Sequence, residues 1–186
     1  MNALEAAGFF TRDRVLGEAE AHALRQGAES LHADDAFRAA GIGRGSDRRA
    51  EMATRSDATA WLWPDTPGFA PLFALFDALR VALNQAAYLG LERYEVQLAR
   101  YQEGARYQRH QDAFAGPASR RITAIYYLNP DWLPAHGGQL RLYVSPPVEL
   151  APIGDRLVVF RSDRVEHEVL PTQAVRFAAT AWYYGR

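Results

Sequence analysis

The strongest constraint on the fold is a change in the spacing of apolar residues at Leu91. From there onward apolar residues recur at every second position, which is typical of strands with one buried face. Turn sequences rich in Gly, Pro, Asn and Asp separate these stretches. The clearest strand segments are 94–99, 122–128, 140–144, 157–160, 166–170 and 175–184. Seven or eight short strands joined by turns predict a sandwich or barrel of the jelly-roll type.

Before Leu91 the apolar residues are spaced by three and four, which predicts helices. The first helix is expected from a cap at Thr11 to Ala28. The second is expected to open at Thr66-Pro67 and to end at Gly90. Helices gathered at the N-terminus would support one face of a sheet.

Between the two predicted helices, the glycine-rich and charged segment 41–50 predicts a loop, and a short strand is expected at 51–55. We therefore expect a single domain over residues 1–186. In this domain residues 1–90 form a helical N-terminal support and residues 91–186 form the β core. The predicted fold class is mainly β with N-terminal helices.

Composition excludes several classes of site and partner. The chain has a formal net charge of −1, so no general attraction to nucleic acid or to an anionic membrane is expected. The absence of cysteine excludes disulfides, thiolate metal sites and cysteine nucleophiles. The N-terminus lacks the pattern of a secretory signal, and no stretch has the length of a membrane span. We expect a cytoplasmic location and a monomer, with the oligomeric state left open.

Two histidines and one aspartate form a candidate metal-binding set. His110 and Asp112 are two residues apart, so on a strand and its exit both side chains point to the same face. His167 opens a later predicted strand and supplies a third ligand. Two imidazoles and a carboxylate are the ligands of non-haem Fe(II) oxygenases, although Zn(II), Mn(II) or Ni(II) also bind such a set. The bland alternative is a His and an Asp that face solvent at a strand end, and this is our interpretation of the remaining histidines, His22, His32 and His136.

Arg176 strengthens the metal hypothesis. It shares one face of the last predicted strand with Ala178, Thr180 and Trp182, and this face is expected to point into the barrel. An arginine inside a barrel needs a partner, since an unpaired buried charge is very costly. An internal carboxylate is one candidate partner. The other is the carboxylate of a bound ligand, which the planar guanidinium suits. The hydroxyl of Tyr127 is a candidate for a further hydrogen bond to such a ligand.

An ordered series of motifs extends over roughly residues 41–186. It consists of Arg55-Ser56-Asp57 with Trp61-Leu62, Leu98-Ala99-Arg100-Tyr101, Tyr107 to Asp112, Arg121 to Asn129 with Trp132, Gly137-Gly138-Gln139-Leu140-Arg141, Asp155 to Phe160, Ser162-Asp163, His167-Glu168-Val169 and Arg176 to Tyr183. This series resembles the 2-oxoglutarate- and Fe(II)-dependent prolyl 4-hydroxylase-like oxygenases, and within them the bacterial relatives of the enzymes that hydroxylate hypoxia-inducible factor. The chain departs from that pattern at Ser56, in Tyr101-Gln102-Glu103-Gly104, and in the loop 41–49, all of which concern the substrate side.

The resemblance implies a double-stranded β-helix fold, a cupin-like jelly roll, and a role for particular residues. The implied iron ligands are His110, Asp112 and His167, and with Thr180, the implied neighbour of a metal-bound water, they form the catalytic set. The implied 2-oxoglutarate contacts are Arg176, Tyr127, Tyr101 and Thr180. The implied substrate contacts are Arg121, Trp182, Arg44 and Arg48, the last two in a loop that covers the substrate.

The activity that the resemblance implies is 4-hydroxylation of a prolyl residue in a protein or peptide, with release of succinate and CO2. The implied cofactors are Fe(II), the cosubstrate 2-oxoglutarate and O2, with ascorbate as a candidate addition. The implied partner is a prolyl-containing polypeptide, for which a bacterial translation factor is a candidate.

Other functions remain open from the sequence. The chain could hydroxylate a free amino acid or small metabolite, or it could be a non-catalytic module that senses 2-oxoglutarate or oxygen. A nucleic-acid demethylase is disfavoured because the chain has no basic excess and lacks the second arginine that demethylases of this kind carry after the clamp arginine. A structural jelly roll would require the whole motif series to be a coincidence.

Overall fold

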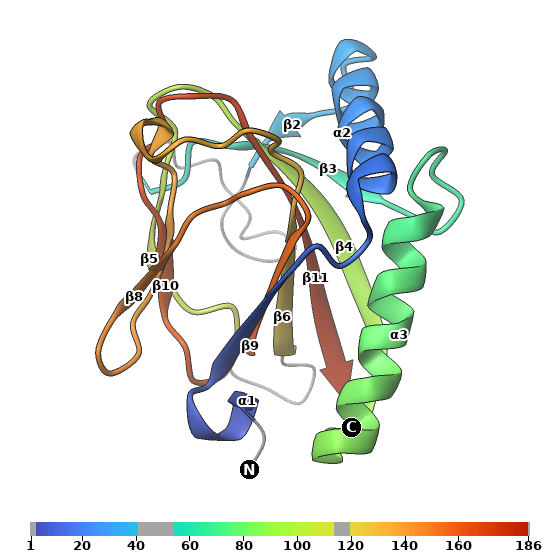
Figure 1. Cartoon of the computed structure of the whole chain (residues 1–186), viewed down its shortest axis with the longest axis vertical. Helices are drawn as coiled ribbons and strands as arrows, with labels where there is room; N and C mark the ends of the chain where they lie inside the picture. The colour runs from blue at the N-terminus through green and yellow to red at the C-terminus, as the bar shows by residue number, and fades with distance from the viewer. Residues whose placement is uncertain (1–2, 41–53, 114–119, 186) are drawn as a thin grey trace, which may run out of the picture.

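Two antiparallel sheets face each other in the computed structural model, which describes residues 3–40, 54–113 and 120–185 (Figure 1). The helices are α1 (Ala3–Ala6), α2 (Glu18–Ala33) and α3 (Ala70–Ala87), with a 3-10 turn at Pro134–His136. The strands are β1 (Phe9–Asp13), β2 (Arg38–Ala39), β3 (Ala58–Leu62), β4 (Leu91–Tyr101), β5 (Tyr107–His110), β6 (Arg120–Tyr127), β7 (Leu140–Leu142), β8 (Val148–Leu150), β9 (Arg156–Arg161), β10 (His167–Val169) and β11 (Arg176–Gly185).

The larger sheet has the strand order β1-β9-β6-β11-β4-β3-β2. Its centre is β11, which pairs along nearly its whole length with β4 on one side and β6 on the other. The nearly continuous apolar sequence of β6 and β11 is explained by this central position, because both faces of these strands are buried.

The smaller sheet has the order β5-β10-β7-β8 and faces the larger one. The space between them is filled by the buried side chains of Ala99, Tyr101, Ala105, Ile125, Tyr127, Leu140, Leu142, Val158, Phe160, Val165, Val169 and Ala178. This arrangement of mainly β structure in two facing sheets confirms the predicted jelly-roll fold class.

Helices α2 and α3 cover the outer face of the larger sheet, as Figure 1 shows. Their buried residues, among them Leu24, Leu72 and Phe76, pack against the outward side chains of the sheet such as Phe177 and Tyr183. The larger sheet therefore separates a helix-facing core from the core that it shares with the smaller sheet. In the described part of the chain, no helix has the length and apolar character needed to cross a membrane.

The first predicted helix begins later than expected. Thr11 lies in β1, where it pairs with Val158 at the edge of the larger sheet, and α2 begins at Glu18 after Gly17. The prediction of a helix cap at Thr11 was wrong. The apolar spacing of three and four also covers residues that form a strand, because they pair with β9. The N-terminal segment thus adds β1, β2 and β3 to the sheet besides its helices.

The second predicted helix also differs at both ends: α3 extends from Ala70 to Ala87 and is closed by Tyr88 with φ 50°. The chain therefore turns out of the helix two residues before Gly90. The predicted loop 41–50 and most of the strand predicted at 51–55 lie outside the described residues; Arg55 forms an isolated bridge with Tyr107.

Candidate active site

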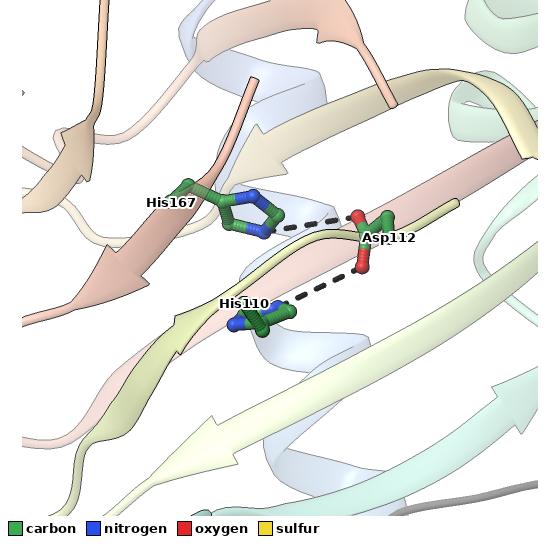
Figure 2. A group of neighbouring side chains, drawn as sticks. All are labelled: His110, Asp112 and His167. Atoms are coloured by element: carbon green, nitrogen blue, oxygen red, sulfur yellow. Dashed lines mark ion pairs between the residues drawn. The ribbon is translucent and has the colours of Figure 1, made fainter. Parts of the chain in front are cut away.

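His110, Asp112 and His167 converge at one end of the smaller sheet. His110 ends β5 and His167 begins β10, and the two residues are paired across these neighbouring strands. Asp112 follows two residues after β5, and its oxygens lie 3.7 Å from Nε2 of His110 and 3.7 Å from Nε2 of His167 (Figure 2). Their potential ligand atoms all lie within 4.8 Å of one another. The strand and its exit thus bring the predicted ligands together, as the spacing required.

Asp112 is held by residues of the larger sheet. Its Oδ2 accepts hydrogen bonds from Thr123 Oγ1 at 2.8 Å and from Trp182 Nε1 at 2.9 Å. Arg120 Nη1 lies 3.8 Å from the other oxygen, Oδ1. Because both donors bind Oδ2, the lone pairs of Oδ1 remain for a metal ion. Such outer partners fix the orientation of a ligating carboxylate.

The electrostatic environment keeps this carboxylate ionised. Burial by itself raises the pKa of Asp112, but electrostatic interactions with the His167 and His110 rings and with Arg120, together with the Trp182 hydrogen bond, outweigh burial and lower the pKa to about 2. A buried carboxylate that is ionised at neutral pH is suited to a divalent cation.

His110 is oriented by its own strand. Its Nδ1 lies 2.7 Å from the carbonyl oxygen of Gln108, which only accepts, so Nδ1 carries the proton and Nε2 offers its lone pair. Burial, followed by the proximity of His167, lowers the pKa of His110 to about 3, so the ring is neutral. The Tyr107 ring stacks on His110 with centroids 3.6 Å apart. Two imidazoles and one carboxylate therefore fit Fe(II) by their donor chemistry.

Arg176 is a buried cation that no carboxylate of the described residues pairs with. Its side chain is 1% exposed, its Nε donates to the Gly138 carbonyl at 3.0 Å, and its guanidinium carbon lies 4.8 Å and 5.0 Å from the ring centres of Tyr101 and Tyr127. Gly138 has φ 63°, and a Cβ there would lie 3.1 Å from Arg176 Cδ, so glycine permits this close approach. The internal salt bridge that the sequence left open does not occur among the described residues.

The hydroxyl of Tyr127 is buried and has no hydrogen-bond partner among the residues that the structure describes. Burial raises the pKa of Tyr127, so the hydroxyl stays protonated and can donate. An unpaired guanidinium beside an unpaired phenol is the arrangement that a ligand carboxylate would complete. Arg176 and Tyr127 therefore fit the distal carboxylate of 2-oxoglutarate, next to the ring of Tyr101.

Thr180 and Trp182 lie on the same strand face as Arg176. Thr180 is half-buried and paired with Gln97 and Ile125, between Arg176 and the end of β11 that carries Trp182. Trp182, predicted as a substrate contact, is 7% exposed and bonded to Asp112, so its observed contact is with the metal ligand.

Arg121 does not lie where the sequence placed it. Its guanidinium donates to the Leu89 carbonyl at 3.1 Å, on the helix side of the sheet. A register shift at the start of β6 instead directs Arg120 to the site, where it covers the Trp182 ring at 3.9 Å. Arg120, and not Arg121, therefore lies beside Asp112 and the Trp182 ring. Arg44 and Arg48 lie outside the described residues.

Two further groups that support the site had no assigned role in the sequence. Thr123 donates to Asp112, and a hydroxyl within an otherwise apolar strand was a signal that could have identified it. Arg55 and buried Asp57 form an ion pair of 2.6 Å, and Arg55 covers the Tyr107 ring that stacks on His110. Arg55 and Asp57 belong to a motif of the sequence. Their contact with His110 through the Tyr107 ring depends on the bridge between Arg55 and Tyr107, which the sequence does not show.

A jelly roll with a facial set of two histidines and a carboxylate, next to a buried arginine, defines a non-haem Fe(II)- and 2-oxoglutarate-dependent dioxygenase. Residues 96–184 match the model of the 2OG-Fe(II) oxygenase superfamily. Human prolyl hydroxylase EGLN3 is 33% identical over 192 residues, covering 97% of this chain and 80% of EGLN3. The chain belongs to the prolyl hydroxylase family of 2-oxoglutarate- and Fe(II)-dependent oxygenases.

Solved structures agree with this assignment. A Pseudomonas putida prolyl-4-hydroxylase superposes with a TM-score of 0.89 at 32% identity, covering 99% of this chain and 96% of the other. A prolyl hydroxylase from Trichoplax adhaerens, solved with a peptide fragment of the hypoxia-inducible factor oxygen degradation domain, gives 0.88 at 32% identity over 98% and 86% of the two chains. The enzyme therefore uses Fe(II), 2-oxoglutarate and O2.

Proposed function

We propose that this enzyme 4-hydroxylates a prolyl residue within a polypeptide and converts 2-oxoglutarate and O2 to succinate and CO2. One oxygen atom enters the substrate C–H bond and the other enters succinate, so the reaction is balanced without a further reductant. The observation that carries the proposal is the His110, Asp112 and His167 set in a chain that shares 33% identity with a prolyl hydroxylase over 97% of its length.

The protein's contribution begins with the metal ligands. Nε2 of each histidine and Oδ1 of Asp112 would hold Fe(II), which together with its cosubstrate supplies the oxidising chemistry when bound. Thr123 and Trp182 keep the carboxylate of Asp112 in one orientation, and Gln108 keeps the His110 tautomer. Three protein ligands would hold the ion, and Fe(II) held in this way would supply further binding positions for cosubstrate and oxygen.

Two buried side chains, Arg176 and Tyr127, would orient the cosubstrate. The guanidinium and the Tyr127 hydroxyl would bind its distal carboxylate, and the apolar side chains between the sheets exclude water from it. Arg120, beside Asp112 and over the Trp182 ring, lies where it can donate to a carbonyl of the substrate chain.

An anaerobic titration with Fe(II) and 2-oxoglutarate tests the metal and cosubstrate sites. A visible charge-transfer band is expected in the wild type and not in His110→Ala. Turnover is then measured with proline-containing peptides and with free proline, by succinate release and by mass spectrometry of the peptide. Hydroxylated peptide supports the proposal. Turnover of free proline alone would mean that the enzyme hydroxylates a small molecule. A charge-transfer band without turnover of any substrate would favour a sensing module.

We further propose a bacterial translation factor as the protein target, the cytoplasm as the compartment and ascorbate as a reductant that maintains Fe(II). The support for these is the likeness to prolyl hydroxylases, one of them from a bacterium. Purified translation factors incubated with the enzyme and mapped by mass spectrometry test the first, since a modified proline in one of them is the expected product. An activity that is unchanged by ascorbate over many turnovers would contradict the last.

A further inference from the structure

Asp112 and Arg120 carry opposite charges and lie side by side without direct contact. Arg120 Nη1 is 3.8 Å from Asp112 Oδ1, although the two side chains are only 15% and 8% exposed. A guanidinium and a carboxylate in direct contact lie about 2.7–2.9 Å apart and form charge-assisted hydrogen bonds. Their attraction increases where water is excluded. A restraint elsewhere on the Arg120 side chain explains why this pair stays open.

The oxygen at which the pair would close is the one that a metal ion needs. Thr123 and Trp182 donate to Asp112 Oδ2, so Oδ1 offers its lone pairs to a cation. A guanidinium bonded to Oδ1 would occupy those lone pairs and bring its positive charge closer to the ion. An internal ion pair and a metal ion are therefore alternatives at this oxygen.

The hydroxyl of Tyr184 restrains Arg120. Arg120 Nε donates to this hydroxyl at 3.3 Å, and the hydroxyl donates to Glu95 Oε2 at 3.0 Å. The direction of both hydrogen bonds is fixed, because a guanidinium only donates and a carboxylate only accepts. The Tyr184 oxygen therefore presents a lone pair to Arg120. Neither Tyr184 nor Glu95 had an assigned role in the sequence.

Tyr184 is itself fixed by the larger sheet. On β11 it is paired with Arg93 of β4 on one side and with Arg120 of β6 on the other, and Figure 1 shows these three strands next to one another. The Arg93 guanidinium covers the Tyr184 ring at 4.0 Å and donates to Glu95 Oε1 at 3.1 Å. The ring is buried, so it is packed in one place. The anchor of Arg120 is thus built into the sheet.

The Trp182 ring fixes the plane of the Arg120 guanidinium. Arg120 Cζ lies 3.9 Å from the centre of this ring, as in a cation–π contact. A guanidinium that is stacked on a ring and bonded at Nε can approach Asp112 only by breaking one of these contacts. Loss of the Tyr184 hydroxyl would keep the stack but would let the guanidinium move across the ring towards Oδ1.

We propose that Tyr184 is a positioning residue of the metal site: its hydroxyl holds Arg120 away from Asp112, so that Oδ1 stays available to the metal ion. The inference rests on the metal site of the proposed function, but not on which substrate is hydroxylated. Tyr184 acts through Arg120 and not by contact with the metal ligands.

Binding of Mn(II) to the metal-free protein tests the proposal without turnover, by competition with a chelating dye. Tyr184→Phe removes only the hydroxyl and is expected to weaken Mn(II) binding about tenfold, as do other changes to groups that orient metal ligands. Arg120→Met removes the competing cation and is expected to bind Mn(II) at least as tightly as the wild type. In the double variant, the change at Tyr184 is expected to alter the affinity less than about twofold, because no cation remains to be restrained.

Tyr183→Phe is the matched control. Tyr183 is the preceding residue of β11, and its side chain belongs to the core on the helix side of the sheet. Its hydroxyl donates to the Phe76 carbonyl at 2.9 Å. This variant also loses a hydrogen bond of a tyrosine hydroxyl, but it is expected to keep the wild-type affinity for Mn(II). The melting temperature of each metal-free variant shows whether it is folded.

The outcomes separate this inference from the proposed function. An unchanged Mn(II) affinity in Tyr184→Phe, or a loss of equal size with and without Arg120, would overturn the inference, because the hydroxyl would then not act through Arg120. Weaker binding in Arg120→Met would overturn it too, since Arg120 would support the ion. A wild type that does not bind Mn(II) would refute both the metal site and this inference. If the expected pattern is found and no peptide is hydroxylated, only the proposed substrate is wrong.

Discussion

At the scale of single residues, the proposed cosubstrate site depends on the buried guanidinium of Arg176, which has no carboxylate partner among the described residues. Arg176 is almost fully buried without a carboxylate partner among the described residues, although burying a guanidinium is costly. In the proposed complex, the distal carboxylate of 2-oxoglutarate would complete the pair. Binding and stability therefore respond to changes at this site in opposite ways.

Replacing Arg176 by alanine should weaken 2-oxoglutarate binding roughly a hundredfold, since one partner of a buried, hydrogen-bonded charge pair is removed. Fe(II) binding should persist, because the guanidinium is not among the ligand atoms that lie together. The anaerobic titration measures both affinities. Arg176→Lys should restore little, since an ammonium group lacks the planar pair of donors; an unchanged 2-oxoglutarate affinity in Arg176→Ala would refute the clamp.

Replacing Tyr127 by phenylalanine should have two effects of opposite sign. The buried hydroxyl has no partner in the described structure, so its removal should raise the free energy of unfolding of the ligand-free protein by about 1 kcal/mol. The affinity for 2-oxoglutarate should fall, because in the proposed complex the same hydroxyl would donate to the ligand carboxylate. Urea unfolding and ligand titration are compared in parallel, and a variant that loses stability and keeps its affinity would contradict the assignment.

Replacing Trp182 by phenylalanine should weaken metal binding roughly tenfold to a hundredfold, because Asp112 loses a hydrogen bond that orients it. The aromatic packing is largely kept, so the fold should persist. Trp132→Phe is the matched control: the Trp132 indole donates to the Gly137 carbonyl at 3.1 Å, away from the metal ligands. Equal metal affinities in the two variants, measured by competition with a chelating dye, would argue against a role for the Trp182 bond.

At the scale of elements, Asp155 attaches α2 to the larger sheet. Its carboxylate accepts hydrogen bonds from the Leu16 and Gly17 amides at 2.9 and 2.8 Å and from the Tyr126 hydroxyl at 3.0 Å. The loop before β9 thereby fixes the start of the helix, which has no side-chain cap of its own.

Asp155→Ala should lower the free energy of unfolding by roughly 2–4 kcal/mol, since three donors lose a buried acceptor and the Tyr126 hydroxyl is left without it. Asp13→Ala is the control: Asp13 is paired with Arg156 but its side chain is 47% exposed, so less than about 1 kcal/mol is expected. Urea unfolding measures both. Equal losses in the free energy of unfolding would mean that the buried hydrogen bonds of Asp155 contribute no more stability than the exposed ion pair of Asp13.

The elements also explain why Arg120 rather than Arg121 reaches the metal site. The two residues are adjacent on β6, and their faces are set by a register shift against β11 between Tyr183 and Tyr184. A β-bulge reverses the side-chain alternation beyond it. Such an irregularity depends on the paired strand, so the sequence of β6 alone could not reveal it.

At the scale of the whole molecule, the site joins the two sheets. The smaller sheet supplies both histidines, and the larger sheet supplies Arg176, Tyr127 and the donors to Asp112. A ligand that contacts both sheets binds only the folded state, so it should stabilise the fold by mass action.

Mn(II) with 2-oxoglutarate should therefore raise the melting temperature. At a hundredfold excess over Kd one ligand adds about 2.7 kcal/mol, and in a chain of this size each kcal/mol corresponds to about 2–4 °C. Removal of the metal by a chelator should reverse the shift. In Arg176→Ala the increment from 2-oxoglutarate should vanish while that from Mn(II) remains; a 2-oxoglutarate increment that survives in this variant would place the cosubstrate elsewhere.

The sequence by itself determined the strand series, the three metal ligands and the buried arginine. These features are encoded locally: a period of two, a spacing of two residues between His110 and Asp112, and a cation on an apolar strand. It could not show whether Arg176 meets an internal carboxylate, because that depends on which side chains the facing sheet brings near it.

Only the tertiary structure decided three features: Thr11 lies in a strand, Arg120 and not Arg121 lies beside Asp112, and residues of the larger sheet hold Asp112. Each depends on residues far apart in the chain, such as Thr11 with Val158 or Trp182 with Asp112. Strand pairing and hydrogen bonding between distant segments are set when the sheets assemble. The local pattern specifies which face of a strand is buried, whereas the partner strands determine its register and therefore what each side chain meets.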